Sequence, residues 1–200
     1  MMEMSKSIEE LVLDKIKRNP RGTLFFADSF SKIASSKSIN KALERLVKSG
    51  EIERVAHGIY VRPVIDKIIG KVFPGIDEIA VAIAKRDRAT IVPTGSYAMF
   101  KLGLTTQVPL NIVFYSDTSA RKIRIGKQTI IFKKASSRNL ACIGEISTLA
   151  IQALRAIGKE QATSGEIRQI KEILKNENPK HLQHDLQLAP VWIRKIISDN

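Results

Sequence analysis

Apolar residues recur at helical spacing in the first third of the chain, most clearly between residues 35 and 50. This spacing predicts one helix with a single apolar stripe, formed by Ile39, Ala42, Leu43, Leu46 and Val47. Ser38, or a serine just before it, suits the start of this helix because its hydroxyl can accept a hydrogen bond from a free backbone amide. Gly50 suits its end, where a residue tolerant of positive φ is favoured.

Two short strand-like runs follow this helix. They are Glu51–Val55 and Ile59–Arg62, and the Ala56-His57-Gly58 turn between them predicts a hairpin. A helix that ends at a glycine and leads directly into a small hairpin is typical of a winged helix-turn-helix. In that fold the helix enters the major groove of DNA and the hairpin is the wing.

The residues before this helix complete the same fold. Ser7–Arg18 is predicted to be a helix, because Ser7 and Glu10 have the spacing of a capping box. Thr23–Phe26 is a short extended stretch, and Asp28 is placed to cap a second short helix over Ser29–Ala34. Residues 1–65 are therefore predicted to form a winged helix-turn-helix domain.

The rest of the chain, residues 66–200, mixes helical and extended patterns. Asp66–Val72 is predicted to be a helical turn that links the two domains. Strands are expected at Thr90–Val92 and Leu110–Tyr115, and a hairpin joins Ile123–Ile125 to Thr129–Phe132 across Gly126-Lys127.

Helices are expected before, between and after these strands along the chain. The predicted helices cover Ile76–Asp87, a short segment capped by Thr94 or Ser96, an amphipathic segment Gly144–Ile157, then Thr163–Lys175, His181–Leu186 and Val191–Ile197. The fold class is therefore α+β: an N-terminal winged helix-turn-helix, then an α+β domain with a small antiparallel sheet and a helical tail.

The charge of the chain narrows the choice of partner. The 200 residues include 33 Lys and Arg but only 20 Asp and Glu, which gives a formal net charge of +13 and a pI near 10.0. Such a balance favours a polyanion, nucleic acid first and an anionic membrane second. The single cysteine excludes an internal disulfide, and no segment has the pattern of a signal peptide or membrane span, so a cytoplasmic protein is expected.

Basic residues lie on the predicted helix opposite its apolar stripe, with Glu44 as the only acid among them. Lysine and arginine can neutralise phosphates, and asparagine or arginine can reach base edges. A solvated helix face or a protein-binding winged domain are the alternatives, and the combined pattern favours DNA. The candidate DNA-binding residues are Ser36, Lys37, Ser38, Asn40, Lys41, Arg45, Lys48, Arg54, His57 and Arg62.

A second basic segment lies between Asp117 and Glu145, where there is no acidic residue. Lys122 and Arg124 alternate there with Ile123 and Ile125, so one face of that strand is predicted to be basic and the other apolar. The alternative is a solvated face whose lysines discourage edge pairing. The candidate second nucleic-acid surface comprises Arg121, Lys122, Arg124, Lys127, Lys133, Lys134 and Arg138.

Enzyme motifs are absent from the sequence. It has neither a phosphate-binding P-loop nor a GxGxxG fingerprint. Thr94-Gly95-Ser96 could hold a phosphate, but a helix cap is the simpler interpretation. His181 and His184 are three residues apart beside Asp185, and a surface pair is favoured over a metal site because further ligands are missing. We therefore predict no catalytic residue, metal or cofactor, and expect a protein that is not an enzyme.

One segment resembles a known family. Pro93–Pro109, with the sequence PTGSYAMFKLGLTTQVP, is followed by the strand Asn111–Tyr115 and resembles the central signature of the AbiEi-type antitoxins. These are the antitoxins of the AbiE abortive-infection (type IV toxin-antitoxin) systems, and the similarity is greatest to the branch paired with nucleotidyltransferase-like toxins. The Gly58–Pro63 segment, GIYVRP, is similar to the G-x-Y pattern that closes the wing in that family.

The resemblance implies a function that spacing alone does not. It implies an autorepressor whose winged domain binds inverted repeats in its own promoter, and a second domain that neutralises the toxin without a stable complex. It also implies that basic surfaces of both domains contact double-stranded DNA. Two alternatives remain: a module that neutralises a toxin by direct contact, and a stand-alone winged-helix transcription regulator with a ligand- or protein-sensing C-terminal domain.

Overall fold

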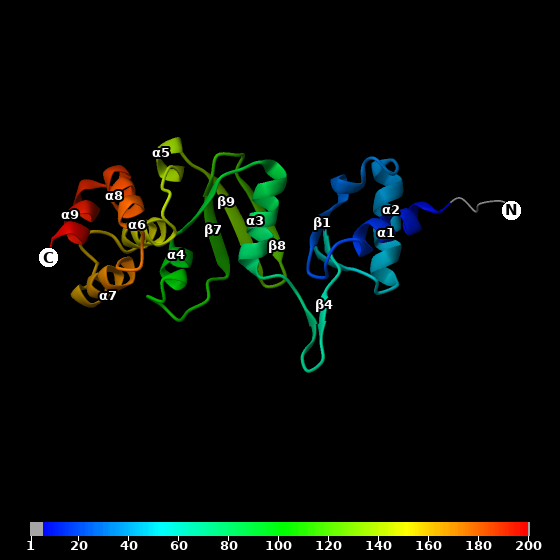
Figure 1. Cartoon of the computed structure of the whole chain (residues 1–200), viewed down its shortest axis with the longest axis horizontal. Helices are drawn as coiled ribbons and strands as arrows, with labels where there is room; N and C mark the ends of the chain where they lie inside the picture. The colour runs from blue at the N-terminus through cyan, green and yellow to red at the C-terminus, as the bar shows by residue number, and fades with distance from the viewer. Residues whose placement is uncertain (1–5, 200) are drawn as a thin grey trace. The chain divides into compact units, whose positions relative to one another are not determined.

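The computed structural model describes residues 6–199 and divides the chain into two compact units, Met1–Ile83 and Ala84–Asn200 (Figure 1). The predicted domain boundary, between residues 65 and 66, lies before this division. The division falls inside α3 (Ile76–Asp87), whose bounds match the predicted helix. The predicted α+β class is confirmed.

The first unit has the element order of a winged helix. It contains α1 (Ile8–Lys17), β1 (Leu24–Phe26), a single 3-10 turn η1 (Ala27–Phe30), α2 (Ser36–Lys48), β2 (Glu53–Ala56) and β3 (Ile59–Val61). The three strands form an antiparallel sheet in the order β1-β3-β2. The predicted strand before the helix therefore pairs with the wing.

Local signals read from the sequence account for the helix ends of this unit. Ser7 and Glu10 form the predicted capping box of α1. Ser35 caps α2, because its Oγ accepts a hydrogen bond from the Ser38 amide at 3.4 Å. Gly50 follows α2 with φ +75°, as a residue at a helix end requires. The core beneath these elements is formed by Val12, Ile16, Phe25, Phe30, Ile39, Ala42, Leu43, Leu46, Ile52 and Tyr60.

Two predictions for this unit are wrong. The helix expected over Ser29–Ala34 is only the 3-10 turn η1, which follows β1 directly and has no side-chain cap from Asp28. The helical turn expected over Asp66–Val72 is a hairpin, formed by β4 (Val64–Asp66) and β5 (Gly70–Val72). Asp66 Oδ1 accepts hydrogen bonds from the Ile68 and Ile69 amides and so closes a tight turn in place of a helix.

The second unit contains a four-stranded sheet. Its strands are β6 (Ile91–Thr94), β7 (Asn111–Ser116), β8 (Arg121–Ile125) and β9 (Gln128–Lys134), in the order β6-β7-β9-β8. The predicted β8–β9 hairpin is confirmed, with Gly126 at φ +56° in its turn. The sheet is mostly antiparallel, as predicted; its one parallel pair is β7–β9, because β8 takes the outer edge and β9 returns between β8 and β7.

Helices pack beside this sheet and form the rest of the second unit. They are α4 (Ser96–Lys101), α5 (Ser137–Leu140), α6 (Glu145–Ile157), α7 (Ser164–Leu174), α8 (Pro179–Leu188) and α9 (Val191–Ser198). The prediction of an amphipathic α6 is wrong at its centre, where every residue from 147 to 154 is buried. The other helices of the tail surround it, so it has no face left for solvent.

The start of α4 also differs from the prediction. Neither Thr94 nor Ser96 caps the helix: its N-cap is Gly95, at φ +63°, with no side-chain hydrogen bond. Thr94 is buried, and its Oγ1 donates to Gln152 Oε1 of α6 at 3.2 Å.

Across residues 6–199, no helix combines the length and apolar character that crossing a membrane requires.

Candidate nucleic-acid interface

The outer face of α2 carries the predicted basic residues in exposed positions. Lys37, Lys41, Arg45 and Lys48 are all exposed, opposite the buried stripe. Arg45 forms an ion pair with Glu9 of α1 at 3.7 Å, and Lys48 forms one with Glu44 at 2.8 Å. Within the described part of the chain, no ion pair involves Lys37 or Lys41, so the two lysines nearest the start of the helix are the ones available to a phosphate.

The N-terminal end of α2 adds to this positive potential. The first turn of the helix contains no acidic residue, whereas the first turn of α1 contains Glu9 and Glu10. The aligned peptide dipoles of a 13-residue helix place partial positive charge at its N-terminus, and free backbone amides point outward there. This end of α2, with Lys37 and Lys41, is therefore suited to an anionic ligand.

The wing presents a linked pair of polar side chains at its turn. Arg54 Nη2 lies 2.8 Å from His57 Nδ1, and Arg54 Nε donates to the Ala56 carbonyl at 3.4 Å. A guanidinium group can only donate, so Nδ1 is the acceptor in this pair. Gly58, at φ +70°, allows the tight turn that holds the pair.

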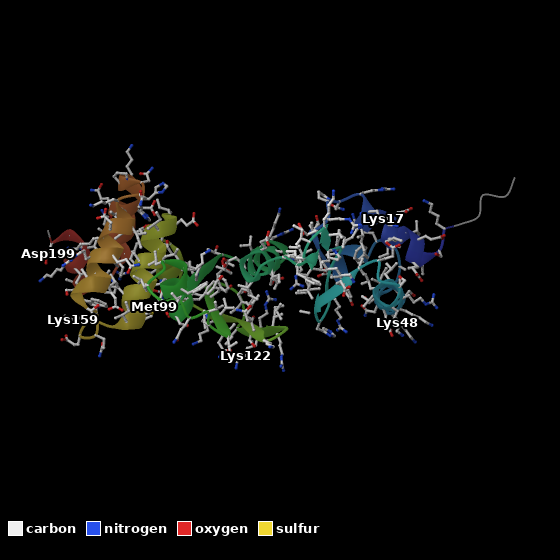
Figure 2. The ribbon with its side chains drawn as sticks, turned by 90° about the horizontal axis from the view of Figure 1, so that it is seen from below. Lys17, Lys48, Met99, Lys122, Lys159 and Asp199 are labelled. Carbon is white, nitrogen blue, oxygen red and sulfur yellow. The ribbon has the colours of Figure 1, made fainter. Side chains whose placement is uncertain are left out.

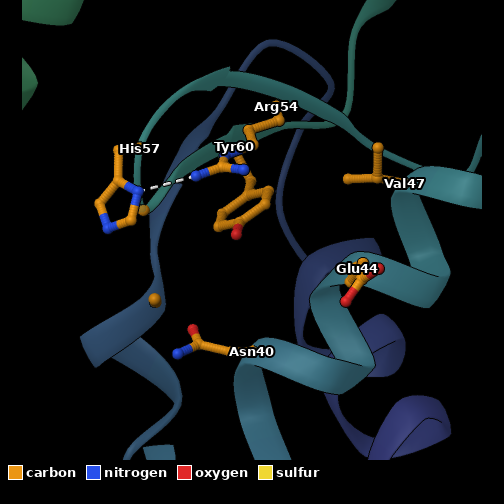
Figure 3. A pocket seen from close by; sticks show the side chains of 8 residues that line it. Asn40, Glu44, Val47, Arg54, His57 and Tyr60 are labelled. Carbon is orange, nitrogen blue, oxygen red and sulfur yellow. Dashed lines mark hydrogen bonds between the residues drawn. The ribbon is translucent and has the colours of Figure 1, made fainter. Parts of the chain in front are cut away.

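A groove of about 440 Å³ separates α2 from the wing (Figure 3). Asn40 lies on the helix side, and Arg54 and His57 lie on the wing side. Glu44, Val47 and Tyr60 also line the groove, so one acid faces the basic groups. The predicted residues Asn40, Arg54 and His57 thus meet at one site, although they are distant in sequence.

Seven of the ten predicted residues of the first unit do not line this groove: the four cations of α2 described above, and Ser36, Ser38 and Arg62. Arg62 follows β3 at the end opposite the wing turn and is half-buried. Ser36 is exposed on the first turn of α2, and the Ser38 hydroxyl is within 3.0 Å of Ser35 Oγ, where it supports the helix cap. Of the predicted residues of α2, Asn40 alone therefore shares the groove with the wing turn, whereas Ser38, Lys41 and Arg45 lie beside the start of α1.

The alternation predicted for β8 in the second unit is confirmed. Lys122 and Arg124 are exposed, whereas Ile123 and Ile125 are half-buried on the other face. Figure 2 shows Lys122 on the outer side of this sheet. Lys127 in the β8–β9 turn and Lys133 and Lys134 at the end of β9 are also exposed.

Arg121 does not join this exposed set. It lies on the same face of β8 as Ile123, its guanidinium forms an ion pair with Asp87, and it lies 5.1 Å from the centre of the Phe132 ring. Arg138, in α5, is exposed, and its Nε donates to the Leu188 carbonyl of α8 at 3.3 Å. A count of basic residues in a segment cannot separate the paired Arg121 from the exposed cations.

The histidines of α8 do not form a metal site. Among residues 6–199, no cluster of three or more His, Cys, Asp or Glu side chains could hold a metal ion. His184 Nδ1 lies 2.8 Å from Asp185 Oδ1, and His181 Nδ1 lies 3.9 Å from Glu177 Oε1. The expected surface pair is therefore what the structure shows for the two imidazoles, each beside a different carboxylate.

These two carboxylates have a structural role that the sequence did not reveal. Asp185 is fully buried and accepts hydrogen bonds from the Ile143 and Gly144 amides, each at 2.9 Å, and from Ser147 Oγ at 2.5 Å. Glu177 accepts from the amides of residues 146 and 147. Together they satisfy the free amides at the start of α6.

The electrostatics of Asp185 reflect this environment. Burial opposes its ionisation, but the hydrogen bonds from Ser147, His184 and the two amides outweigh burial and hold the pKa of the carboxyl below its usual range. The ionised carboxylate is therefore the form that the folded second unit stabilises.

Comparison with known proteins identifies a family and a distant structural similarity. Residues 11–182 match a family of unknown function, DUF6088. No curated protein matches the chain. The crystal structure of the RV2827C protein from Mycobacterium tuberculosis is similar with a TM-score of 0.47 and 10% sequence identity, over 96% of this chain and 80% of that chain.

Proposed function

The chain belongs to the DUF6088 family, whose function is unknown. From its own residues, we propose that it is a DNA-binding antitoxin. It binds inverted repeats in its own promoter through the winged unit and so represses its operon. It neutralises a nucleotidyltransferase-like toxin without forming a stable complex with it. It acts in the cytoplasm and is not an enzyme.

The observation that supports DNA binding most strongly is the outer face of α2. Lys37 and Lys41 are exposed and take part in no ion pair among residues 6–199, at the positive end of a helix with no acid in its first turn. In helix-turn-helix proteins the N-terminal residues of the recognition helix contact the bases. Asn40 lies between these lysines in sequence and faces the groove beside the wing, where it can reach a base edge.

The toxin-directed part of the proposal rests on the resemblance of Pro93–Pro109. The structure separates this segment into a buried part and an exposed part. Tyr97, Ala98 and Leu102 are core residues of the second unit. Val108, in the loop before β7, is 58% exposed, and Leu110, which follows the segment directly, is 65% exposed, so this loop presents apolar side chains that another molecule can contact.

Charge reversal on α2 tests DNA binding. The Lys37→Glu/Lys41→Glu variant is expected to lose binding to the DNA upstream of its own gene and to derepress a promoter fusion. Lys159→Glu/Lys180→Glu is the matched control, because it changes the charge equally at two exposed positions of the second unit. Equal loss in both variants, or unchanged repression by the α2 variant, would contradict a specific role for this helix.

A second assay tests the antitoxin role. Co-expression of the protein with the nucleotidyltransferase-like product of a neighbouring gene is expected to restore growth, without co-elution of the two proteins on gel filtration. Continued growth arrest would contradict neutralisation. Stable co-elution would show that the toxin is blocked by direct contact.

A further inference from the structure

The sheet of the second unit has two faces of different character. The strand register places Ile112, Phe114, Ile130 and Phe132 on one face, and all four are at most 2% exposed. The opposite face of β7, β9 and β8 carries only exposed or half-buried residues. They are Asn111, Val113, Tyr115, Lys122, Arg124, Thr129, Ile131 and Lys133, and we call this set the open face.

The register arranges the open face in three rows across the strands. Tyr115 lies beside Lys133 in the first row. Val113, Ile131 and Lys122 form the second row, and Asn111, Thr129 and Arg124 form the third. An aromatic and apolar strip on β7 and β9 is therefore bordered by cations.

The charge of the open face is unbalanced. No ion pair in the described chain involves Lys122, Arg124 or Lys133, and the sequence has no acidic residue between Asp117 and Glu145. On the opposite face, by contrast, Arg121 is neutralised by Asp87. The cations of the open face can therefore bind an external anion. Because they are distributed over two strands, β8 and β9, a ligand with several negative charges can contact them together.

The shape of this face determines which polyanion it fits. On β6 the residues of this face, Val92 and Thr94, are buried, so β7, β9 and β8 present it. Neighbouring strands lie about 4.8 Å apart, so these three strands span about 10 Å between their outer axes, before the width of their side chains is added. The major groove of B-DNA is about 12 Å wide and admits a helix or a two-stranded ribbon, not a three-stranded sheet face. A duplex could therefore reach the lysines only through its phosphates, and its stacked bases could not reach Tyr115.

We propose that the open face binds single-stranded nucleic acid. Phosphates lie on Lys122, Arg124 and Lys133, and an unstacked base packs on Tyr115 and Ile131. Sheets that present aromatic and basic residues on one face bind single strands in this way, because every base has a stacking surface. This ligand differs from the promoter duplex of the proposed function, and the proposal depends only on the second unit.

The test measures binding of the full-length protein to fluorescent oligonucleotides by anisotropy. The probes are a 12-nucleotide RNA, the DNA of the same sequence and the corresponding blunt DNA duplex, all unrelated to the promoter. We expect both single strands to bind more tightly than the duplex, because only they can place a base on Tyr115. Tighter binding of RNA than of DNA would identify RNA as the ligand, and the reverse would identify single-stranded DNA.

Three variants separate stacking from charge. Tyr115→Leu is expected to weaken single-strand binding about tenfold, while Tyr115→Phe keeps the ring and retains affinity. Lys122→Ala/Arg124→Ala is expected to reduce the salt dependence of single-strand binding by about 1.4 in log–log slope. Lys159→Ala/Lys180→Ala, with the same loss of charge elsewhere on the second unit, serves as the control. Thermal melting followed by the single tryptophan, Trp192 in α9, shows whether each variant folds.

The outcomes distinguish this proposal from the proposed function. Lys37→Glu/Lys41→Glu is expected to lose promoter binding and keep single-strand binding. If a folded Tyr115→Leu variant binds single strands as tightly as the wild type, the proposal is overturned. It is also overturned if the duplex binds as tightly as the single strands in the Lys37→Glu/Lys41→Glu variant, in which binding of duplex by the winged unit is removed. Preferred binding of the duplex in that variant would make the open face a phosphate-contact surface for DNA instead.

Discussion

Replacement of Asp185 by asparagine is expected to destabilise the second unit strongly. Each carboxylate oxygen accepts two hydrogen bonds: Oδ1 from the Ile143 amide and His184 Nδ1, and Oδ2 from the Gly144 amide and Ser147 Oγ. Asparagine keeps one oxygen acceptor, but its NH₂ group can only donate. Two of the four hydrogen bonds are therefore lost at a site with no access to solvent.

The size of the effect follows from these lost bonds. Hydrogen bonds to a charged group contribute about 1.5–3 kcal/mol each, so Asp185→Asn should lower the free energy of unfolding by about 3 kcal/mol. With an unfolding entropy of about 2.1 cal/mol/K per residue, this corresponds to a fall of about 12 °C in Tm for a unit of this size.

Tryptophan fluorescence is the appropriate assay. Trp192 is the only tryptophan in the chain and packs against the core of the second unit, so its emission follows the unfolding of that unit. The control is Glu172→Gln on the exposed side of α7, which should change stability by less than about 0.5 kcal/mol. A fall of less than about 3 °C for Asp185→Asn would refute the inference that this carboxylate holds the start of α6.

The same variant has a predictable pH dependence. Because the pKa of Asp185 is lowered in the folded state, its ionised form contributes stability above the unfolded-state pKa, about 3.9. That contribution disappears as the pH falls through the lower folded-state pKa. The difference in Tm between the wild type and Asp185→Asn should therefore be constant above about pH 5 and shrink below about pH 4. A difference as large at pH 3 as at pH 7 would contradict the lowered pKa.

Three further changes test other parts of the structure. Arg121→Ala should lower the free energy of unfolding of the second unit by about 1–2 kcal/mol, because it removes one of the two arginines paired with Asp87 and uncovers Phe132. Lys122→Ala on the open face should change it by less than about 0.5 kcal/mol in the same tryptophan assay. Gly58→Ala should cost about 1 kcal/mol and weaken DNA binding, since φ is +70° in the wing turn; an unchanged circular-dichroism melt of the first unit would contradict this. Glu44→Gln should tighten DNA binding about two- to fivefold at low salt, because it removes the negative charge from the groove and releases Lys48 from its ion pair. Weaker DNA binding of this variant, measured by anisotropy, would contradict a phosphate contact near this helix.

Local patterns predicted the helices and strands well where a single signal dominates. The stripe of α2, the Ser7–Glu10 capping box and the Gly126 turn depend on neighbouring residues, and all three are confirmed. The basic face of β8 also follows from simple alternation. These features need no knowledge of the tertiary structure, because period and capping are properties of a short segment.

The features that spacing did not predict are decided either by side-chain hydrogen bonds to the backbone or by residues distant in sequence. The turn at Asp66 is closed by side-chain hydrogen bonds to the backbone, which compete with helix formation in a way that hydrophobic spacing does not reveal. The parallel β7–β9 pair depends on which edge β8 takes. Asp185 becomes a structural carboxylate only because α8 packs against the start of α6, more than thirty residues earlier in the chain.

The candidate interface shows the same division. Spacing located the exposed lysines of α2, but it did not show that Arg45 and Lys48 are paired with Glu9 and Glu44. It also could not separate Arg121 from Lys122, adjacent residues on opposite faces of one strand. Which cations are free to bind a ligand is decided by the acids packed beside them, and those contacts are tertiary.

Binding of the protein to the DNA upstream of its own gene, measured as a function of salt, tests the central claim most directly. We expect specific binding whose logarithm falls linearly with the logarithm of salt concentration, with a slope near −0.9 for each phosphate contacted. In Lys37→Glu/Lys41→Glu the slope should be less steep by about 2, and the preference for the promoter sequence should be lost. Weak binding that is equal for the promoter and for unrelated duplexes, and unchanged in this variant, would contradict a promoter-binding role for the winged unit.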